Sequence, residues 1–230
     1  AVDHFEGHTF RVQVANPPYS ANVQHPELMP DDERFNTYGK YVPKSKADLA
    51  FVQHMVHHMD DDGRIAVLLP HGVLFRGAAE ETIRQYLIEK LNVIDAIIGL
   101  PSNLFFGTSI PVCVIVCKKN RNGNSGNILF IDASKEFQSG KNQNVLTDEG
   151  IQKISKAYQD RTDKEKFAHV ADMQEIIDND YNLNIPRYVD TFEEEKPIDL
   201  HAVKAQIEAL DSETKAAIDK AESFMRQLGL

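Results

Sequence analysis

The chain has 230 residues, of which 42% are hydrophobic and 26% are charged, a balance that excludes collagen-like, low-complexity and disordered chains. No apolar run approaches the ~18 residues of a membrane span, and the first ten residues lack the apolar segment of a signal peptide. The chain has two cysteines, so a reducing compartment is expected. The sequence therefore predicts a cytoplasmic protein without membrane contact.

The net charge is −10, and an acidic chain is an unusual stand-alone binder of nucleic acid. The acid is concentrated at one end: residues 160–230 hold 9 basic and 17 acidic side chains, whereas residues 1–159 hold 16 and 18. The first part is therefore nearly neutral. We expect a chain that does not hold DNA by itself, although its charge says little against chemistry on DNA.

The first part of the chain alternates strand-like and helix-like segments. A short β-rich run at 10–15 ends at two prolines, and helical spacing of apolar residues over 47–59 predicts a helix that stops near Gly63, a suitable C-cap. A second helix is predicted over 78–91. Apolar runs typical of buried strands occupy 64–70, 93–101, 112–119 and 127–133. This alternation predicts an α/β fold with a mostly parallel sheet. The turn-rich loop between the last two runs predicts that they pair as an antiparallel hairpin at the sheet edge.

From about residue 148 the pattern becomes helical, and residues 199–230 form one long predicted helix. Alternating spacings of four and three make a heptad seam of Val203, Ile207, Leu210, Thr214, Ala217, Ala221, Phe224 and Leu228. An amphipathic helix folded onto its own core is one interpretation. We favour a seam for a partner helix, because the stripe is narrow and the other faces are charged. The predicted subunit contacts are Val203, Ile207, Leu210, Phe224 and Leu228.

The most informative residues are Asn16, Pro17, Pro18 and Tyr19, which follow a predicted strand directly. Ligands of open α/β sheets bind at the carboxyl ends of the strands. The prolines stiffen the loop and remove two N–H donors, so the Asn16 side-chain oxygen and the Pro17 carbonyl can both accept from one NH2 group. Tyr19 offers a flat face to a planar ring. Such a cradle aims the nitrogen lone pair at an electrophile; the alternative is a proline-stiffened loop without a chemical role.

The run VANPPYS at 14–20 resembles the catalytic motif of amino-methyltransferases that use S-adenosylmethionine. Four longer stretches resemble the modification (M) subunit of type I restriction–modification systems: 47–91, 94–120, 128–154 and 179–190. The resemblance implies the C-terminal half of a Rossmann-like methyltransferase sheet with an edge β-hairpin, followed by an α-helical tail. It also implies N6-methylation of adenine in duplex DNA, at a site chosen by a specificity subunit, in a complex with a restriction subunit.

The resemblance also implies roles for the motif. Asn16 and Pro17 accept hydrogen bonds from adenine N6, Pro18 holds the loop rigid, and Tyr19 stacks on the flipped base. A second aromatic contact is implied from a loop before a later strand, and there Phe105 is favoured over Phe106, with core packing as the alternative. Flipping costs a few kcal/mol and one stack returns about 1–3 kcal/mol, so other DNA contacts are needed.

The family begins its catalytic domain with a glycine-rich loop and an acidic residue for the cofactor ribose. Only Gly7 precedes Asn16 among the glycines, so the cofactor-binding residues are unknown. We expect this chain alone to bind S-adenosylmethionine weakly or not at all and to be inactive. We expect three parts: residues 1–137 as the catalytic-loop half of the methyltransferase domain, 138–197 as a helical and loop extension, and 198–230 as a helix for subunit contact.

Two other functions remain open. A protein glutamine N5-methyltransferase also presents this motif to an NH2 group, and a non-catalytic module would only dock on a specificity subunit. A metal site is a further consideration, because His54, His57 and His58 lie at i, i+3 and i+4. A polar helix face is the favoured interpretation of these histidines, and no metal is predicted.

Overall fold

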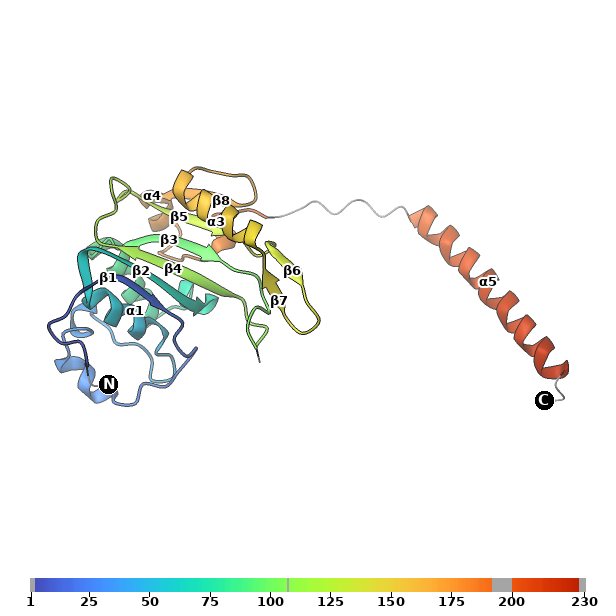
Figure 1. The fold of residues 1–230 in the computed structure, drawn as a ribbon, viewed down its shortest axis with the longest axis horizontal. Helices are drawn as coiled ribbons and strands as arrows, with labels where there is room; N and C mark the ends of the chain where they lie inside the picture. Colours follow the sequence, from blue (N-terminus) through green and yellow to red (C-terminus); the bar gives the residue numbers. More distant parts are fainter. Residues whose placement is uncertain (1–2, 107, 192–199, 228–230) are drawn as a thin grey trace. The chain divides into compact units, whose positions relative to one another are not determined.

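The computed structural model describes residues 3–106, 108–191 and 200–227 (Figure 1). By its internal contacts the chain divides into two units, residues 1–191 and 192–230, and each is described by itself. Among the described residues, no helix combines the length and the apolar character that crossing a membrane requires.

The first unit is built on a mixed β-sheet, which has six strands within the described residues. In their order across the sheet, these strands are β1 (Phe10–Ala15), β2 (Met59–Pro70), β4 (Val112–Lys118), β3 (Ile94–Gly99), β5 (Asn127–Asp132) and β8 (Ala168–Asp172). Strands β1, β2, β3 and β5 run in one direction, and β4 and β8 run in the other. The predicted α/β class with a mostly parallel sheet is confirmed.

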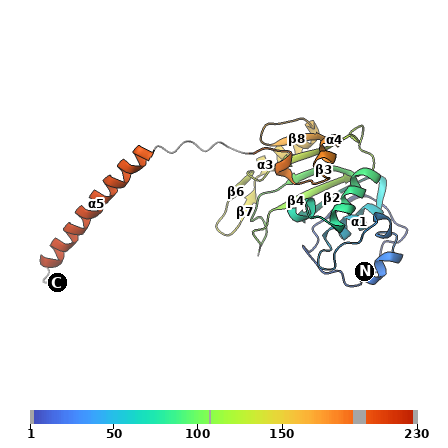
Figure 2. The same cartoon turned by 180° about the vertical axis from the view of Figure 1, so that it is seen from behind.

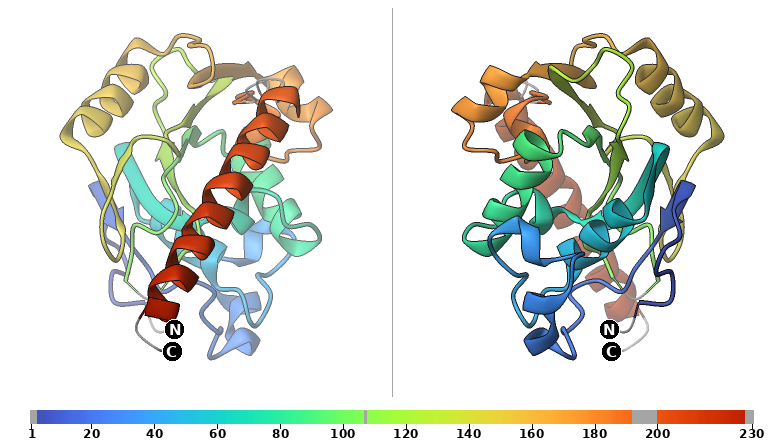
Figure 3. Two further views of the ribbon diagram at one scale, coloured as in Figure 1. Left: turned by 90° about the vertical axis from the view of Figure 1, so that its right-hand side faces the viewer. Right: turned by 90° about the vertical axis from the view of Figure 1, so that its left-hand side faces the viewer.

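Helices cover both faces of the sheet (Figures 2 and 3). Their bounds are α1 (Asp48–His57), α2 (Ala79–Gln85, continued by a π-helical turn at Tyr86–Lys90), α3 (Asp148–Asp160) and α4 (Met173–Asp178). A separate two-stranded ribbon consists of β6 (Phe137–Ser139) and β7 (Asn144–Leu146). Short 3-10 turns lie at Pro26–Asp31, Asn36–Tyr38, His71–Leu74 and Ile185–Arg187. The second unit contains α5 (Leu200–Gln227).

Strand β3 shows how the sheet separates two apolar cores. All six of its residues are buried, and their side chains alternate between the faces, as the pleat requires. Ile97 joins the larger core, together with Leu49 of α1. Ala96 and Ile98 join the smaller core on the other face, together with Ala157 of α3.

The predicted hairpin between 112–119 and 127–133 is wrong. Strand β4 lies between β2 and β3 and is antiparallel to both, whereas β5 pairs with the far side of β3 in parallel orientation. Strand β3 therefore lies inside the sheet, with β4 and β5 as its two partners. The antiparallel pair at this edge of the sheet is β5 with β8.

The predicted C-cap at Gly63 is also wrong, because α1 ends at His57 and β2 has begun at Met59. Gly63 lies where the pairing of β1 with β2 slips by several residues of β2. A Cβ atom on Gly63 would stand 2.5 Å from the Met59 Cγ and 2.7 Å from the Asp60 carbonyl oxygen. Glycine is therefore needed for a close approach within a bulged strand.

Strand β1 has one exposed face. Val12 is 71% exposed and Val14 is 79% exposed. Both border a groove of about 380 Å³ that runs across the sheet toward α3 and is otherwise lined in large part by apolar side chains, among them Ile98, Val114, Val116, Ile151 and Ile154. Within the described residues, β2 is the only strand paired with β1. An exposed apolar groove beside an edge strand is typical of a surface that another segment covers.

Candidate active site

The Asn16–Tyr19 loop lies at the edge of the sheet where ligands of α/β proteins bind. It follows β1, whose last residue is Ala15. Because β1, β2 and β3 are parallel to one another, the loops after β2 and β3 leave the sheet at the same edge. The structure therefore brings the segments 16–19, 71–76 and 100–106 to one side of the first unit.

Within the loop, two of the predicted residues contact each other. The Tyr19 hydroxyl donates a hydrogen bond to the Asn16 side-chain oxygen across 3.1 Å. Asn16 and Pro18 are exposed, and Pro17 and Tyr19 are half-buried. Burial raises the pKa of Tyr19, with a smaller contribution from Cys113, so its hydroxyl remains a donor at neutral pH. The Asn16 oxygen, the predicted acceptor for an amino group, is thus exposed and already holds one donor.

Ser20, the residue that follows the motif, is held by a hydrogen bond to Asp48. Ser20 has a φ of +50°, and its N–H donates to the Asp48 carboxylate at 2.6 Å. The sequence prediction did not include Asp48, because an acidic residue at the first position of a helix is expected from helix electrostatics alone. The signal that was available is its position at the start of the predicted amphipathic helix.

The two phenylalanines of the loop after β3 differ in exposure. Phe105 is half-buried and forms an isolated bridge with Thr108, whereas Phe106 is 87% exposed. The ribbon of β6 and β7 supports this loop, because Asn144 donates its backbone N–H to the Asn103 carbonyl and its side-chain amide to the Ser102 carbonyl, both within 2.9 Å. Which aromatic ring meets a base stays a prediction.

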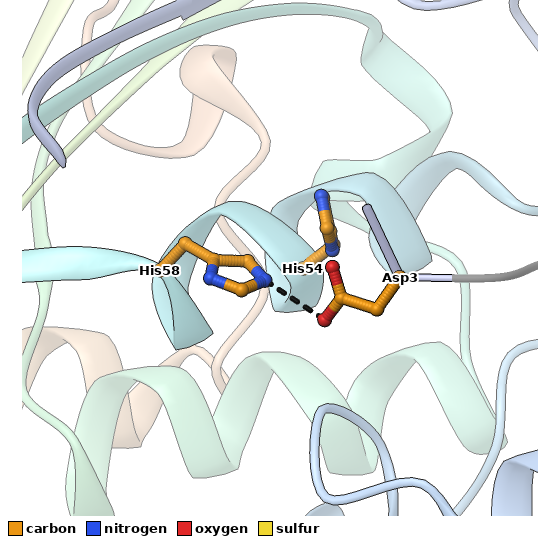
Figure 4. A group of neighbouring side chains, drawn as sticks. All are labelled: Asp3, His54 and His58. Atoms are coloured by element: carbon orange, nitrogen blue, oxygen red, sulfur yellow. Dashed lines mark hydrogen bonds and ion pairs between the residues drawn. The ribbon is translucent and has the colours of Figure 1, made fainter. Parts of the chain in front are cut away.

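His54 on α1 and His58 directly after it meet an acidic residue from the start of the chain (Figure 4). One ligand atom each of Asp3, His54 and His58 lies within 4.8 Å of the others. The His58 Nε2 is 3.0 Å from Asp3, and its Nδ1 is 2.8 Å from the His8 carbonyl. The Arg34 guanidinium, however, is 3.1 Å from the His54 Nδ1 and 3.6 Å from Asp3.

This arrangement is better suited to an ion-pair network than to a metal ion, because a guanidinium at that distance repels a cation. Burial raises the pKa of Asp3, but hydrogen bonds from the Phe5 N–H and His58 outweigh that effect and lower it. Burial lowers the pKa of His54, and His58 and Arg34 add to this. The cluster fixes the start of the chain against α1, and the absence of a metal stays a prediction.

The heptad residues lie on α5. Val203, Ile207, Leu210 and Phe224 are between 40% and 61% exposed, and Leu228 lies outside the described residues. The intervening seam positions Thr214, Ala217 and Ala221 are exposed as well. The helix therefore presents the predicted seam, and its occupant stays a prediction.

Comparisons with known proteins show the family of the chain. The sequence model of the N-6 DNA Methylase family matches residues 1–197. The chain is 35% identical, over 95% of its length, to the type I restriction enzyme MpnII methylase subunit of Mycoplasma pneumoniae, and 36% identical, over 92%, to the MjaVII methylase subunit of Methanocaldococcus jannaschii. It covers 40% and 38% of those two proteins.

A solved structure is similar as well. The methyltransferase subunit of a type I restriction-modification system from Streptococcus thermophilus is 56% identical, superimposes with a TM-score of 0.77, and is matched over 81% of this chain and 39% of its own. The chain thus spans about 40% of the length of these relatives. From its sequence and its structure alike, the chain belongs to the N-6 DNA methylase family.

Proposed function

We propose that this chain is the catalytic-loop part of a type I modification subunit, which transfers a methyl group from S-adenosylmethionine to N6 of adenine in duplex DNA. The observation that carries the proposal is the Asn16–Tyr19 loop, which follows the carboxyl end of β1, a strand parallel to its neighbour β2. Two oxygen acceptors, those of the Asn16 side chain and the Pro17 carbonyl, hold the amino group. Accepting both N–H bonds pulls the nitrogen lone pair out of conjugation with the ring and orients it for attack.

The target base must leave the DNA stack to reach this loop. Extruding it costs a few kcal/mol, and stacking on the half-buried Tyr19 ring returns about 1–3 kcal/mol. Phe105 is the proposed second aromatic contact, since its loop leaves the same edge of the sheet. The remaining energy comes from DNA contacts made elsewhere in the complex, which fits the nearly neutral charge of residues 1–159.

The described residues do not by themselves build a cofactor site. In Rossmann-like folds a cofactor usually rests on a glycine-rich turn between a strand and a helix, and the strands described here are not followed by such a turn. We propose that further segments of an intact subunit supply its site, and that they cover the groove at Val12 and Val14. The 230-residue chain alone is then inactive.

The proposal is tested with an intact modification subunit, assembled with its specificity subunit. Methyl transfer from labelled S-adenosylmethionine is measured as N6-methyladenine in a digested DNA duplex. Asn16→Ala should lower the rate about 10²–10³-fold. Asn120→Ala is the matched control, because Asn120 follows the antiparallel strand β4 and so lies at the opposite edge of the sheet. An unchanged rate in Asn16→Ala would refute the proposed role of the loop.

A protein glutamine N5-methyltransferase is not favoured, because the relatives named above are methylase subunits of restriction enzymes. The same preparation separates the two functions when it is offered a glutamine-containing peptide in place of DNA. Label in the peptide amide, and none in DNA, would replace the present proposal with that alternative.

We also propose that the α5 seam contacts the specificity subunit, and that the restriction subunit and duplex DNA join through the same cytoplasmic complex. The support is a 28-residue helix whose described apolar seam residues are exposed. Removing residues 199–230 should abolish co-purification with the specificity subunit. A complex that survives the deletion would instead indicate internal packing of the helix. An undeleted complex that forms but does not methylate DNA would favour a non-catalytic docking module.

A further inference from the structure

Ser20 is the point at which the Asn16–Tyr19 loop is tied to the body of the protein. Its φ of +50° is a left-handed conformation that residues other than glycine rarely adopt, so surrounding contacts must hold it. The principal one is the hydrogen bond from the Ser20 N–H to Asp48 Oδ1 at 2.6 Å. The Lys46 ammonium adds a second by donating to the Ser20 hydroxyl at 3.1 Å.

The Asp48 carboxylate is well suited to be a fixed point. Its side chain is fully buried, and it occupies the first position of α1, where the helix dipole favours a negative charge. While Oδ1 accepts from Ser20, Oδ2 accepts from both terminal nitrogens of Arg76 at 3.2 and 3.3 Å. Both oxygens are therefore in use, and the carboxylate cannot rotate without breaking one set of contacts.

Arg76 is itself fixed by its surroundings. It donates to Glu80 at 2.8 Å, and Arg84 donates to the Arg76 carbonyl at 2.6 Å. Its guanidinium lies so close to Gly72 that a Cβ there would come within 2.5 Å of a guanidinium nitrogen. Since Arg76 follows β2 and the loop follows β1, the chain of contacts links two neighbouring strand ends.

Two backbone hydrogen bonds add to this connection. The Ala47 N–H donates to the Ala21 carbonyl at 2.9 Å, and the Val23 N–H donates to the Lys44 carbonyl at 2.7 Å. The residues just before α1 and the segment just after Ser20 are thus joined by backbone hydrogen bonds as well. A displacement of Asp48 would be transmitted through Ser20 to the Asn16 side-chain oxygen and the Pro17 carbonyl.

We propose that Asp48, held by Arg76, is a positioning residue that sets the direction of the Asn16 and Pro17 acceptors through Ser20. The inference rests on the proposed function of the loop. Asp48 does not touch the substrate; it acts by fixing the loop in the shape that receives the amino group. A misplacement of about 1 Å at such a site lowers a rate about 10²-fold.

The test compares two buried, ion-paired carboxylates. Asp48→Asn and Asp48→Ala are matched by Asp95→Asn, which removes the charge of a fully buried carboxylate paired with Lys118 and Arg161 away from the loop. In an intact subunit with its specificity subunit, Asp48→Ala should lower kcat for adenine methylation about 100-fold and leave the KM for S-adenosylmethionine within twofold. Asp48→Asn, which keeps an oxygen for Ser20, should restore about a tenth of the wild-type kcat. Asp95→Asn should lower Tm but not kcat.

A second measurement needs no activity. Hydrogen exchange of the 230-residue chain should show faster exchange confined to residues 16–23 in Asp48→Asn, with α2 and β3 as protected as in the unsubstituted chain. A kcat that is unchanged per folded protein, or exchange at 16–23 that is unchanged, would overturn the positioning role. An unsubstituted complex without adenine methylation would instead refute the proposed function, and the exchange result would still decide whether Asp48 holds the loop.

Discussion

Tyr19 gives a sharp test of the loop, because its ring and its hydroxyl are expected to act in opposite directions. The ring is the proposed stacking surface for the base. The hydroxyl, by contrast, donates to the Asn16 oxygen at 3.1 Å, which is the acceptor that the adenine amino group needs. Tyr19→Phe removes the hydroxyl alone, and Tyr19→Ala removes both.

The magnitudes follow from the two contacts. A neutral hydrogen bond of this kind contributes about 0.5–1.5 kcal/mol. If Asn16 must give it up to bind the amino group, Tyr19→Phe should bind the flipped base up to about tenfold more tightly. If the Asn16 side-chain oxygen accepts from the Tyr19 hydroxyl and the amino group together, Tyr19→Phe should leave the affinity for the flipped base unchanged. Loss of the stack costs about 1–3 kcal/mol, so Tyr19→Ala should bind the flipped base about 5- to 150-fold more weakly.

The assay uses a duplex with 2-aminopurine in place of the target adenine, whose fluorescence rises when the base leaves the stack. It is titrated with an intact subunit in complex with its specificity subunit, and methylation of the adenine duplex is measured in parallel. A Tyr19→Phe variant that is as weak as Tyr19→Ala would refute the assignment, because the ring alone would then contribute nothing.

Other consequences concern stability and the second aromatic ring. Asp95→Ala should destabilise the chain by about 3–5 kcal/mol in urea unfolding, because it leaves the buried Arg121 and the partly buried Lys118 and Arg161 near one another without their carboxylate; a loss below about 1 kcal/mol would contradict this. The pKa of His54 is lowered by burial, so its contribution is present above about pH 6.5 and is lost as the pH falls. His54→Gln should flatten the fall in unfolding free energy between pH 7 and pH 5, and an unchanged slope would show that other groups cause it. Phe105→Ala should reduce 2-aminopurine fluorescence more than Phe106→Ala, and the reverse order would assign the base contact to Phe106.

Much of the fold follows from local patterns, and its errors come from long-range packing. The apolar runs that became β2, β3, β4 and β5 mark themselves as strands because burial on both faces demands apolar side chains at successive positions. The pattern of apolar residues does not indicate which strands pair with each other. The turn-rich loop of eight residues between β4 and β5 is compatible with a hairpin and equally with a crossing over β3. The two arrangements differ only in long-range pairing, in which β3 lies between β4 and β5.

In the candidate site, too, the residues of a local motif could be predicted and those joined by long-range contacts could not. Asn16 to Tyr19 could be found because the motif is contiguous and its residue types indicate its chemistry. Asp48, Arg76 and Ser20 could not, since they come together from three segments up to 56 residues apart. Charged residues that support a loop from behind look in the sequence like the ordinary polar ends of helices.

The exposed face of β1 leads to a prediction that depends on how much of the subunit is present. Val14 is 79% exposed, so Val14→Asp should change the unfolding free energy of the 230-residue chain by about 1 kcal/mol or less. In an intact subunit whose further segments cover the groove, the same substitution buries an unpaired charge and should cost several kcal/mol. Val145→Asp on β7, at 55% exposure, is the matched control and should behave alike in both. Urea unfolding of the four variant proteins measures these differences. Equal effects of Val14→Asp in the short and the intact chain would mean that the groove stays open, and the β1 edge would then be a surface for a separate partner.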